Sequence, residues 1–418
     1  MMTEGLINNT NGIMNKEKRD LFDGLIRDVA KNVLGWKDCE VLISDISSGN
    51  INYIYRVQHD GADNSVIFKF ADNETRVKPD GYLAPERNAH EASCLKWYAK
   101  CQPRFVPKVL HVDKENHFFV MEDLSDTITL REAFMKNLVH PTLGATIATI
   151  IIETSFPLLD VVRKKKTENL PCWNTTSNDL LALTEQLVFE DPYYNRRGKN
   201  IYTQGNEEFI KKALDNDELL GWVEKLKKKF KTCKQALIHG DLHTGSILVR
   251  ATKDGISNKT GLQCSPDLYV MDTEFACYGP VSYDLGNVAA HIFFAQAFNF
   301  YHAETDANKK LLFEQFEKIH ATLLLFFKVY AEKKLNGMLW QLKGARKAFV
   351  KQYVQDILIE SIRYAGCEII RRVVGSAKVP ELMQLTNNED QISMERALIE
   401  GAVGFIIDPI KTSSCDIT

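Results

Sequence analysis

Apolar residues in the first third of the chain occur in short runs bounded by turn residues, a pattern that is typical of strands. The runs are rich in Ile, Val, Tyr and Phe and cover Val41–Ile46, Asn52–Gln58, Val66–Phe70 and His117–Met121. Between the third and fourth runs, Ala92, Leu95 and Tyr98 recur at the spacing of one helix face, which predicts a helix over Glu86–Lys100. The pattern therefore predicts a small unit of strands with one helix.

The composition changes after the acidic pair Glu122-Asp123. The remainder of the chain has a mostly helical pattern, and two strand-like runs, Ala236–His239 and Leu268–Met271, interrupt it. Polar and acidic residues follow directly after each of these two runs. We therefore expect an α+β fold with a small lobe over residues 1–122 and a larger, mainly helical lobe over residues 123–418.

The composition narrows the possible functions. Of the 418 residues, 44% are hydrophobic and 26% are charged, as in an ordinary globular protein. The formal net charge is only −3, so no strong basic field attracts nucleic acid or anionic lipid. The N-terminal segment is too polar for a secretory leader, and the longest apolar stretch, Leu143–Ile152, is too short to span a bilayer. Nine cysteines without a CxxC pair are typical of free thiols in a reducing compartment. These features predict a cytoplasmic protein that binds neither membranes nor nucleic acid.

The strongest chemical signal is the segment His239–Ile247, in which a strand end passes into a loop that carries Asp241 and His243. The next strand-like run ends in Asp272-Thr273-Glu274. Because side chains alternate along a strand, Asp272 and Glu274 are expected to point to the same face. Two carboxylates on one face suit Mg²⁺, which usually also binds substrate phosphates. The pattern predicts a metal–nucleotide site with Asp241 beside it, although each motif alone is also typical of a solvated strand end or an ordinary loop.

These segments resemble those of the methylthioribose kinases, a family of protein-kinase-like phosphotransferases that act on small molecules. In residues 239–247 of this chain, Ser246 stands where aminoglycoside and choline kinases usually have Asn, and this Ser is typical of methylthioribose kinases. Residues 272–280 resemble the family's D-P-E-F-A-x-Y-G-P segment, with Thr273 in place of the usual Pro. Further similarity lies in residues 183–193 and in residues 365–372. The resemblance therefore extends over most of the chain.

The resemblance implies a bilobal protein-kinase-like fold with ATP bound between a small antiparallel-sheet lobe and a helical lobe. The implied reaction phosphorylates the anomeric hydroxyl of 5-methylthioribose, which gives 5-methylthioribose 1-phosphate and ADP in methionine salvage. The implied reaction requires ATP and Mg²⁺. The resemblance also implies that the protein is a homodimer. No dimer interface is evident in the sequence.

The nucleotide site implied by the resemblance lies mainly in the first third of the chain. Gly49 and Asn50 fall in the hairpin that would cover the phosphates, although a single glycine also fits an ordinary turn. Lys69 is the one charge in an apolar strand and would hold phosphates while pairing with Glu91 of the helix. The segment Glu122-Asp123-Leu124 would be the hinge whose backbone binds adenine.

The remaining residues implied by the resemblance lie in the second lobe. Asp272, Thr273 and Glu274 would contact the nucleotide, and Asp272 and Glu274 would hold Mg²⁺ with Ser246 as a weaker contact. Asp241 would orient the acceptor hydroxyl and accept its proton.

Arg371 and Arg372 would contact the sugar and neutralise the transferred phosphate. Two arginines before Gly375 also suit an ordinary helix C-terminus. Because adjacent helix residues are about 100° apart, both can reach one ligand only across a broad site.

Two departures from the family and two alternative functions remain open. Tyr82-Leu83-Ala84-Pro85 replaces the usual Trp-Pro-Leu loop near the nucleotide, and residues 254–265 form a longer insertion. A related kinase for choline, an aminoglycoside or another sugar is the first alternative. The second is a nucleotide-binding module without catalytic activity.

Overall fold

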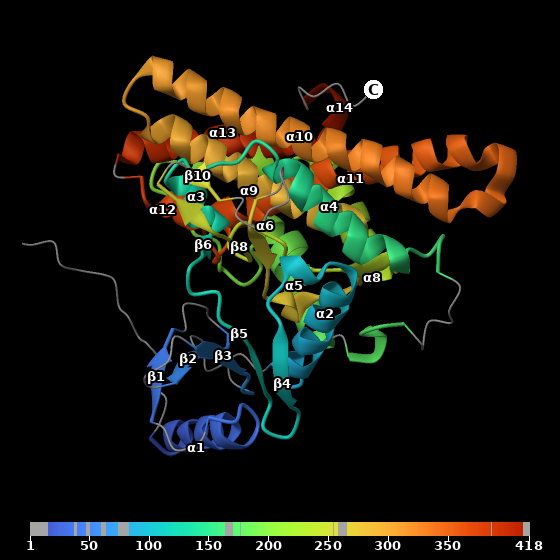
Figure 1. The fold of residues 1–418 in the computed structure, drawn as a ribbon. Coiled ribbons are helices and arrows are strands. Elements are labelled where there is room, and N and C mark those ends of the chain that lie inside the picture. Colours follow the sequence, from blue (N-terminus) through green and yellow to red (C-terminus); the bar gives the residue numbers. More distant parts are fainter. Residues whose placement is uncertain are drawn as a thin grey trace, which may run out of the picture.

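The computed structural model describes residues 16–36, 40–46, 51–59, 64–73, 83–163, 170–175, 177–253, 255–257, 266–385 and 387–412. Strands are concentrated in the N-terminal third, and long helices form most of the rest (Figure 1). The strands are β1 Val41–Asp45, β2 Tyr53–His59, β3 Ser65–Phe70, β4 Val109–Asp113, β5 Phe118–Glu122, β6 Ile128–Thr129, β7 Ala236–Ile238, β8 Ile247–Val249, β9 Ala251–Thr252, β10 Gly255–Ile256, β11 Leu268–Val270 and β12 Cys277–Gly279.

The helices differ widely in length, and α9, α10 and α11 are the longest. The α-helices are α1 Lys16–Asn32, α2 Arg87–Cys101, α3 Leu130–Met135, α4 Leu143–Ser155, α5 Asn178–Glu185, α6 Asp191–Tyr194, α7 Glu207–Leu214, α8 Asp217–Thr232, α9 Val281–His302, α10 Asp306–Met338, α11 Arg346–Val374, α12 Pro380–Met383, α13 Asn388–Ile407 and α14 Pro409–Thr412. The short 3-10 or π turns are η1 Pro103–Phe105, η2 Phe156–Leu158, η4 Trp173–Thr175, η5 Gln186–Glu190, η6 Thr273–Phe275 and η7 Trp340–Ala345.

The N-terminal sheet has five antiparallel strands in the order β1-β2-β3-β5-β4. Helix α1 packs on one face, where Phe22 stacks on Phe70 with ring centroids 4.1 Å apart. The predicted strands and the helix α2 are confirmed within one or two residues at each end, whereas α1 and β4 were not predicted. Strand β5 ends at Glu122, where the lobe boundary is predicted, and the boundary itself stays a prediction.

Helix α2 connects the sheet to the helical part of the chain. Its expected core positions Ala92, Leu95 and Tyr98 are 1%, 0% and 3% exposed. On its other side, a His90 ring nitrogen lies 2.7 Å from the Ala276 carbonyl oxygen, and Trp97 donates to the Thr154 carbonyl at 3.0 Å. Strands and helices therefore meet at α2, and the expected bilobal α+β fold is confirmed (Figure 1).

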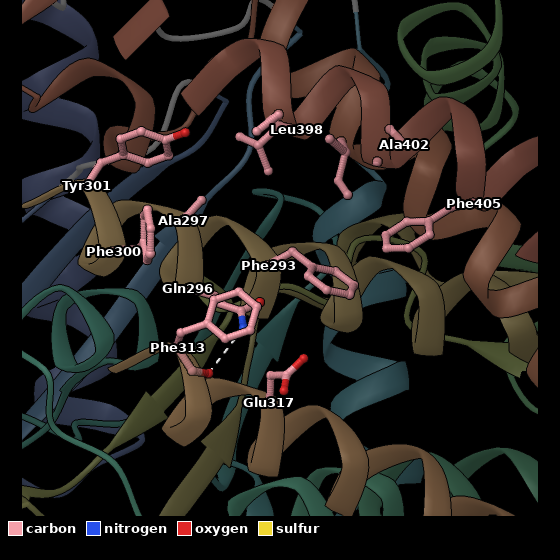
Figure 2. Close-up of a pocket in the computed structure, with 13 residues that line it drawn as sticks. Phe293, Gln296, Ala297, Phe300, Tyr301, Phe313, Glu317, Leu398, Ala402 and Phe405 are labelled. Atoms are coloured by element: carbon pink, nitrogen blue, oxygen red, sulfur yellow. Dashed lines mark hydrogen bonds between the residues drawn. The ribbon is translucent and has the colours of Figure 1, made fainter. Parts of the chain in front are cut away.

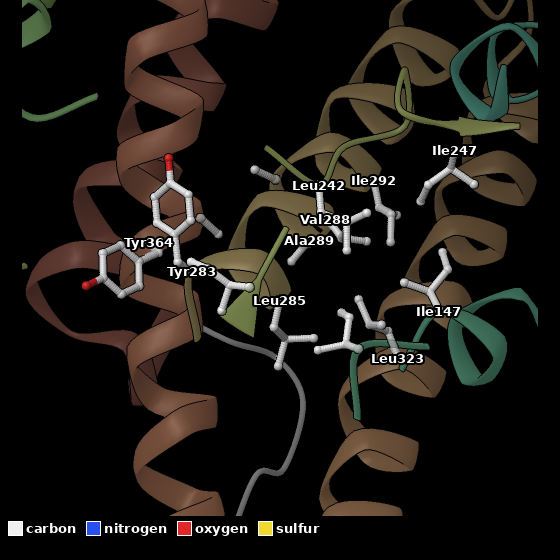
Figure 3. Close-up of a cluster of buried hydrophobic side chains, with 14 of the residues drawn as sticks. Ile147, Leu242, Ile247, Tyr283, Leu285, Val288, Ala289, Ile292, Leu323 and Tyr364 are labelled. Carbon is white, nitrogen blue, oxygen red and sulfur yellow. The ribbon is translucent and has the colours of Figure 1, made fainter. Parts of the chain in front are cut away.

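Helix α9 runs through the centre of the helical part and carries its core. Most of its residues are buried, and it packs against α10 and α11. Leu242 and Ile247, which flank the loop predicted to be catalytic, enter the same apolar cluster as Val288 and Ile292 of α9 (Figure 3). Burial of these four side chains fixes the loop against a rigid helix. Among the described helices, none is long and apolar enough to cross a membrane.

Candidate functional site

Lys69 lies between two carboxylates. Its Nζ atom donates to Glu91 Oε1 of α2 at 2.9 Å and to Asp272 Oδ1 at 2.5 Å. The Lys69 and Glu91 side chains are 4% and 1% exposed, whereas the Asp272 side chain is 47% exposed. The structure thus brings together three predicted site residues from a strand, a helix and a loop.

Electrostatics keep Lys69 and Asp272 charged. Burial disfavours the ammonium group, but Asp272 and Glu91 outweigh this effect and raise the pKa of Lys69 above its ordinary value. Burial also disfavours the Asp272 carboxylate, but Lys69 lowers the pKa of that group overall. A fixed cation beside an exposed, ionised carboxylate is an arrangement suited to binding a phosphate chain together with a metal ion.

The backbone around Asp272 differs from the strand that was expected. Strand β11 ends at Val270, Asp272 has a left-handed conformation with φ of 67°, and Thr273–Phe275 form the 3-10 turn η6. The prediction that strand alternation places Asp272 and Glu274 on one face is therefore wrong in its geometry. A non-glycine residue in this conformation is uncommon, and such residues concentrate at functional sites.

Glu274 is held by two residues that the sequence analysis missed. Asn52 donates its Nδ2 to Glu274 Oε2 at 2.9 Å, and Arg87 Nε lies 3.6 Å from the same oxygen. Arg87 also donates to Asn52 Oδ1 at 2.8 Å and to the Leu83 carbonyl at 3.0 Å. Burial and the nearby Asp272 raise the pKa of Glu274 above its ordinary value. The buried Arg87 thus ties Glu274 to the start of β2.

Asp284 of α9 fixes the start of the loop at residues 239–247. The Asp284 carboxylate accepts the backbone N–H groups of His239 at 2.6 Å and Gly240 at 2.9 Å. The ring nitrogen Nε2 of His239 lies 2.9 Å from the Met271 carbonyl oxygen, which places this loop beside the turn that carries Asp272. Asp284 was not predicted, although it lies close after the matched segment 272–280.

Gly240 has a conformation and a contact that only glycine permits. Its φ is +82°, and a Cβ atom at this position would lie 2.1 Å from the Phe275 carbonyl oxygen. We expect Gly240→Ala to destabilise the fold by more than the ~1–3 kcal/mol of the backbone strain alone, because the backbone of the two loops must also separate.

Thermal unfolding of Gly240→Ala and Gly221→Ala gives the measurement and its control. Gly221 lies in α8, and a Cβ atom there has no neighbour within 4 Å. This control is expected to gain about 0.5–1 kcal/mol. Equal melting temperatures for the two variants would contradict the close approach at Gly240.

Asp241 faces the arginine pair of α11. Its Oδ1 atom lies 3.2 Å from Arg371 Nη2 and 3.7 Å from Arg372 Nη2, and its Oδ2 atom lies 3.5 Å from His243 Nε2. Burial opposes ionisation, but His243 and the two guanidinium groups outweigh it and hold the pKa of Asp241 well below its ordinary value. The structure thus brings Asp241, Arg371 and Arg372 together.

His243 and Ser246 close the loop around Asp241. His243 Nδ1 accepts the backbone N–H groups of Gly245 at 2.9 Å and Ser246 at 3.0 Å, so the proton of the neutral ring is on Nε2, toward Asp241. The Ser246 hydroxyl lies 2.9 Å from the His243 carbonyl oxygen, and the residue is only 1% exposed. Ser246 is therefore bonded within the loop, and its contact to a metal ion stays a prediction.

The other predicted nucleotide residues fall into two groups. Gly49 and Asn50 lie outside the described residues, as do Tyr82 and most of the insertion at 254–265. The predicted hinge segment Glu122-Asp123-Leu124 begins at the last residue of β5. The Asp123 carboxylate accepts from Arg56 Nε at 2.7 Å and from the Ser65 hydroxyl at 2.6 Å, so its side chain ties this segment to the sheet.

Asp272 and Glu274 fit a Mg²⁺ ion by the chemistry of their donors. Both offer carboxylate oxygens, which Mg²⁺ prefers over nitrogen or sulfur. Asp272 is ionised and half exposed, and Asn52 and Arg87 hold Glu274 in place. These two residues would hold the ion, together with oxygen atoms from phosphates or water.

A separate pocket of about 390 Å³ lies between α9, α10, α11 and α13 (Figure 2). Its walls are mainly aromatic and aliphatic, and Gln296 and Glu317 are its polar residues. None of the predicted site residues lines this pocket. We therefore take the cluster around Lys69, Asp272 and Asp241, and not this pocket, as the candidate site.

Comparison with known proteins finds relatives that cover most of the chain. The methylthioribose kinase of Exiguobacterium sibiricum is 32% identical over 359 residues, which cover 85% of this chain and 85% of that protein. The methylthioribose kinase of Bacillus cereus strain AH820 is 29% identical over 367 residues, covering 86% of this chain and 85% of that protein.

Two solved structures are also similar over most of their length. A choline kinase from Cryptosporidium parvum has a TM-score of 0.46 and 13% identity, covering 92% of this chain and 98% of that one. A glucosamine kinase has a TM-score of 0.48 and 12% identity, covering 91% of this chain and 84% of that one. The sequence profile of the phosphotransferase enzyme family matches residues 43–317, about two thirds of the chain and the part that holds Lys69, Asp241 and Asp272. The chain belongs to the phosphotransferase enzyme family.

Proposed function

We propose that this protein is an ATP-dependent kinase that phosphorylates the anomeric hydroxyl of 5-methylthioribose, giving 5-methylthioribose 1-phosphate and ADP in methionine salvage. The observation that carries the proposal is that the ionised Asp241 faces Arg371 and Arg372. Its loop lies beside the turn that carries Asp272, and Asp272 pairs with Lys69. Relatives named methylthioribose kinase, at 27–32% identity, support this choice of acceptor. The expected homodimer stays a prediction.

On the nucleotide side, Lys69 steadies the phosphate chain while Glu91 holds the ammonium group in place. The backbone of Glu122-Asp123-Leu124 binds adenine, and Gly49 and Asn50 cover the phosphates. Asp272 and Glu274 would hold Mg²⁺, with Ser246 as a weaker contact. Thr273 between them is 0% exposed and donates its hydroxyl to the Glu91 carbonyl oxygen at 3.2 Å, and its contact with the nucleotide stays a prediction. When bound, Mg²⁺ neutralises charge on the phosphates.

On the acceptor side, Asp241 orients the sugar hydroxyl and accepts its proton. Because the pKa of Asp241 lies well below its ordinary value, this carboxylate is a weak base at neutral pH. Its main contribution is therefore to position the hydroxyl, and the proton moves late in the transfer, as a loose transition state permits. Arg371 and Arg372 bind the sugar and neutralise the transferred phosphoryl group, whose bond to the acceptor oxygen forms as its bond to ADP breaks.

A cationic acceptor fits this site less well. Arg371, Arg372 and the nearby Arg131 place three guanidinium groups around Asp241. Choline and aminoglycosides carry positive charge, and choline sites commonly use an aromatic cage rather than arginines. The alternative of a non-catalytic module is disfavoured because Lys69, Asp241, Asp272 and Glu274 are all present.

A coupled ADP-release assay with Mg²⁺ and ATP tests the proposal. It compares 5-methylthioribose with ribose, choline and an aminoglycoside as acceptors. We expect ADP release to be selective for 5-methylthioribose. Faster release with another acceptor would assign a different substrate, and ATP binding without turnover of any acceptor would favour the non-catalytic alternative.

A further inference from the structure

Glu368 of α11 is a buried carboxylate beside the arginine pair. Its side chain is 1% exposed. Arg371 and Arg372 follow it by three and four residues, the two spacings that place helix side chains next to one another. Two adjacent arginines that diverge by about 100° around the helix can therefore share this one partner between them.

The contacts divide each guanidinium group between two carboxylates. Arg371 donates its Nε to Glu368 Oε2 and its Nη2 to Glu368 Oε1 at 3.1 Å, and Arg372 donates its Nε to Oε1 at 2.8 Å. The Nη2 atoms of both arginines are also the atoms closest to Asp241. Glu368 thus holds the Nε atoms of both arginines and shares Arg371 Nη2 with Asp241. Arg372 Nη1 donates to the Ala377 carbonyl oxygen at 3.2 Å, and its Nη2 is directed toward Asp241.

His291 of α9 fixes Glu368 from the opposite side. Its Nε2 atom lies 3.0 Å from Glu368 Oε1, and its Nδ1 atom lies 3.3 Å from Arg131 Nη2. Because arginine can only donate, Nδ1 accepts and Nε2 carries the proton that is donated to Glu368. Burial, with Arg131 and His243 nearby, holds the pKa of His291 well below its ordinary value, so the ring is neutral.

The positive charges of Arg371 and Arg372 require a carboxylate at position 368. Burial opposes ionisation of Glu368, but Arg371 and Arg372 outweigh it and hold its pKa well below the ordinary value. Two buried guanidinium groups are then balanced by the carboxylates of Glu368 and Asp241. Without Glu368, one buried positive charge has no counter-charge, which is strongly unfavourable.

We propose that Glu368 is a positioning residue for phosphoryl transfer, which orients Arg371 and Arg372 so that their Nη groups bind the acceptor and the transferred phosphate beside Asp241. The inference rests on the proposed function for the identity of the acceptor. The geometry of the inference is independent of the proposed function, because Glu368 makes these contacts with residues of this chain.

Glu368→Gln tests the proposal because it keeps the size of the side chain and removes its charge. One oxygen becomes an NH₂ group, which cannot accept from a guanidinium group. We expect kcat with 5-methylthioribose to fall about 100-fold, the effect of misplacing a reacting group by about 1 Å, while KM for ATP stays unchanged.

Glu395→Gln is the matched control. Glu395 is 0% exposed and accepts from Thr203 at 2.6 Å, Asn206 at 2.8 Å and Lys378 at 3.3 Å rather than from the arginine pair. Its loss is expected to lower the melting temperature and to leave kcat unchanged. A kcat for Glu368→Gln equal to that of Glu395→Gln would overturn the proposal.

Arginine labelling gives a second measurement that needs no acceptor. Phenylglyoxal modifies free guanidinium groups, and mass spectrometry locates the modified residues. We expect Arg371 and Arg372 to react severalfold faster in Glu368→Gln than in wild type or Glu395→Gln, and unchanged rates would overturn the proposal whatever the kinetics. If wild type does not phosphorylate 5-methylthioribose, the proposed function fails, and the labelling still decides the role of Glu368.

Discussion

Asp241→Asn is expected to lower kcat about a thousandfold while the affinity for ATP stays unchanged. The variant keeps the shape of the side chain but loses the charge that orients the hydroxyl and accepts its proton, a contribution of about 10²–10⁴-fold in enzymes. A thousandfold loss corresponds to about 4 kcal/mol of transition-state stabilisation. We expect ATP affinity to be maintained because the proposed function assigns the nucleotide to Lys69, Asp272 and Glu274. Steady-state kinetics and calorimetric titration with ATP measure the two quantities.

Asp191→Asn provides the control for this variant. Asp191 is also mostly buried and pairs with an arginine, since Arg197 Nη2 lies 2.5 Å from its Oδ2 atom. It lies on α6, outside the candidate site, and its loss is expected to leave kcat unchanged. If Asp241→Asn turns over at the wild-type rate, Asp241 has been given the wrong role.

Asp272→Ala is expected to abolish the Mg²⁺ dependence of nucleotide binding. In wild type, Mg²⁺ should raise the affinity for ATP by at least about 1.4 kcal/mol, which is tenfold. The variant lacks the exposed, ionised carboxylate at the site, and Glu274 alone is buried and bonded to Asn52. Calorimetric titration of ATP with Mg²⁺ and with EDTA measures this difference in each protein.

The same titrations on Asp191→Ala show whether loss of any paired aspartate has this effect. We expect this control to keep the full response to Mg²⁺. If Asp272→Ala also keeps a tenfold response, the assignment of Asp272 as a metal ligand is wrong, and a response lost in both variants would point to a general loss of structure.

The secondary structure was predictable where local pattern and burial agree. Strands β2, β3 and β5 are short apolar runs, and they are buried on the N-terminal sheet. Helix α1 was missed although Phe22, Ile26 and Val29 have helical spacing, because its mean composition is polar and its partner is the distant face of the sheet. Strand β4 mixes apolar and polar positions and has no clear alternation.

The candidate site was predictable as a set of residues but not as a geometry. The motifs identified Lys69, Asp272 and Asp241, which the fold brings together from strand β3 and two adjacent loops. The residues that hold them, such as Asn52 and Asp284, act through contacts with residues far away in the sequence, and no local pattern marks such contacts. Glu368 alone had a local signal, since it stands three and four residues before the arginine pair.

The position of α11 has a consequence for how acceptor choice can change in evolution. The family profile covers residues 43–317, which hold the groups proposed to bind the nucleotide and the metal ion, whereas Arg371 and Arg372 lie beyond it on α11. In the proposed function, the residues that bind the nucleotide are therefore encoded apart from the arginine pair that binds the sugar, while Asp241 belongs to the earlier stretch. Mutations in the later stretch would then alter the contacts to the acceptor while leaving Lys69, Asp272 and Glu274 unchanged.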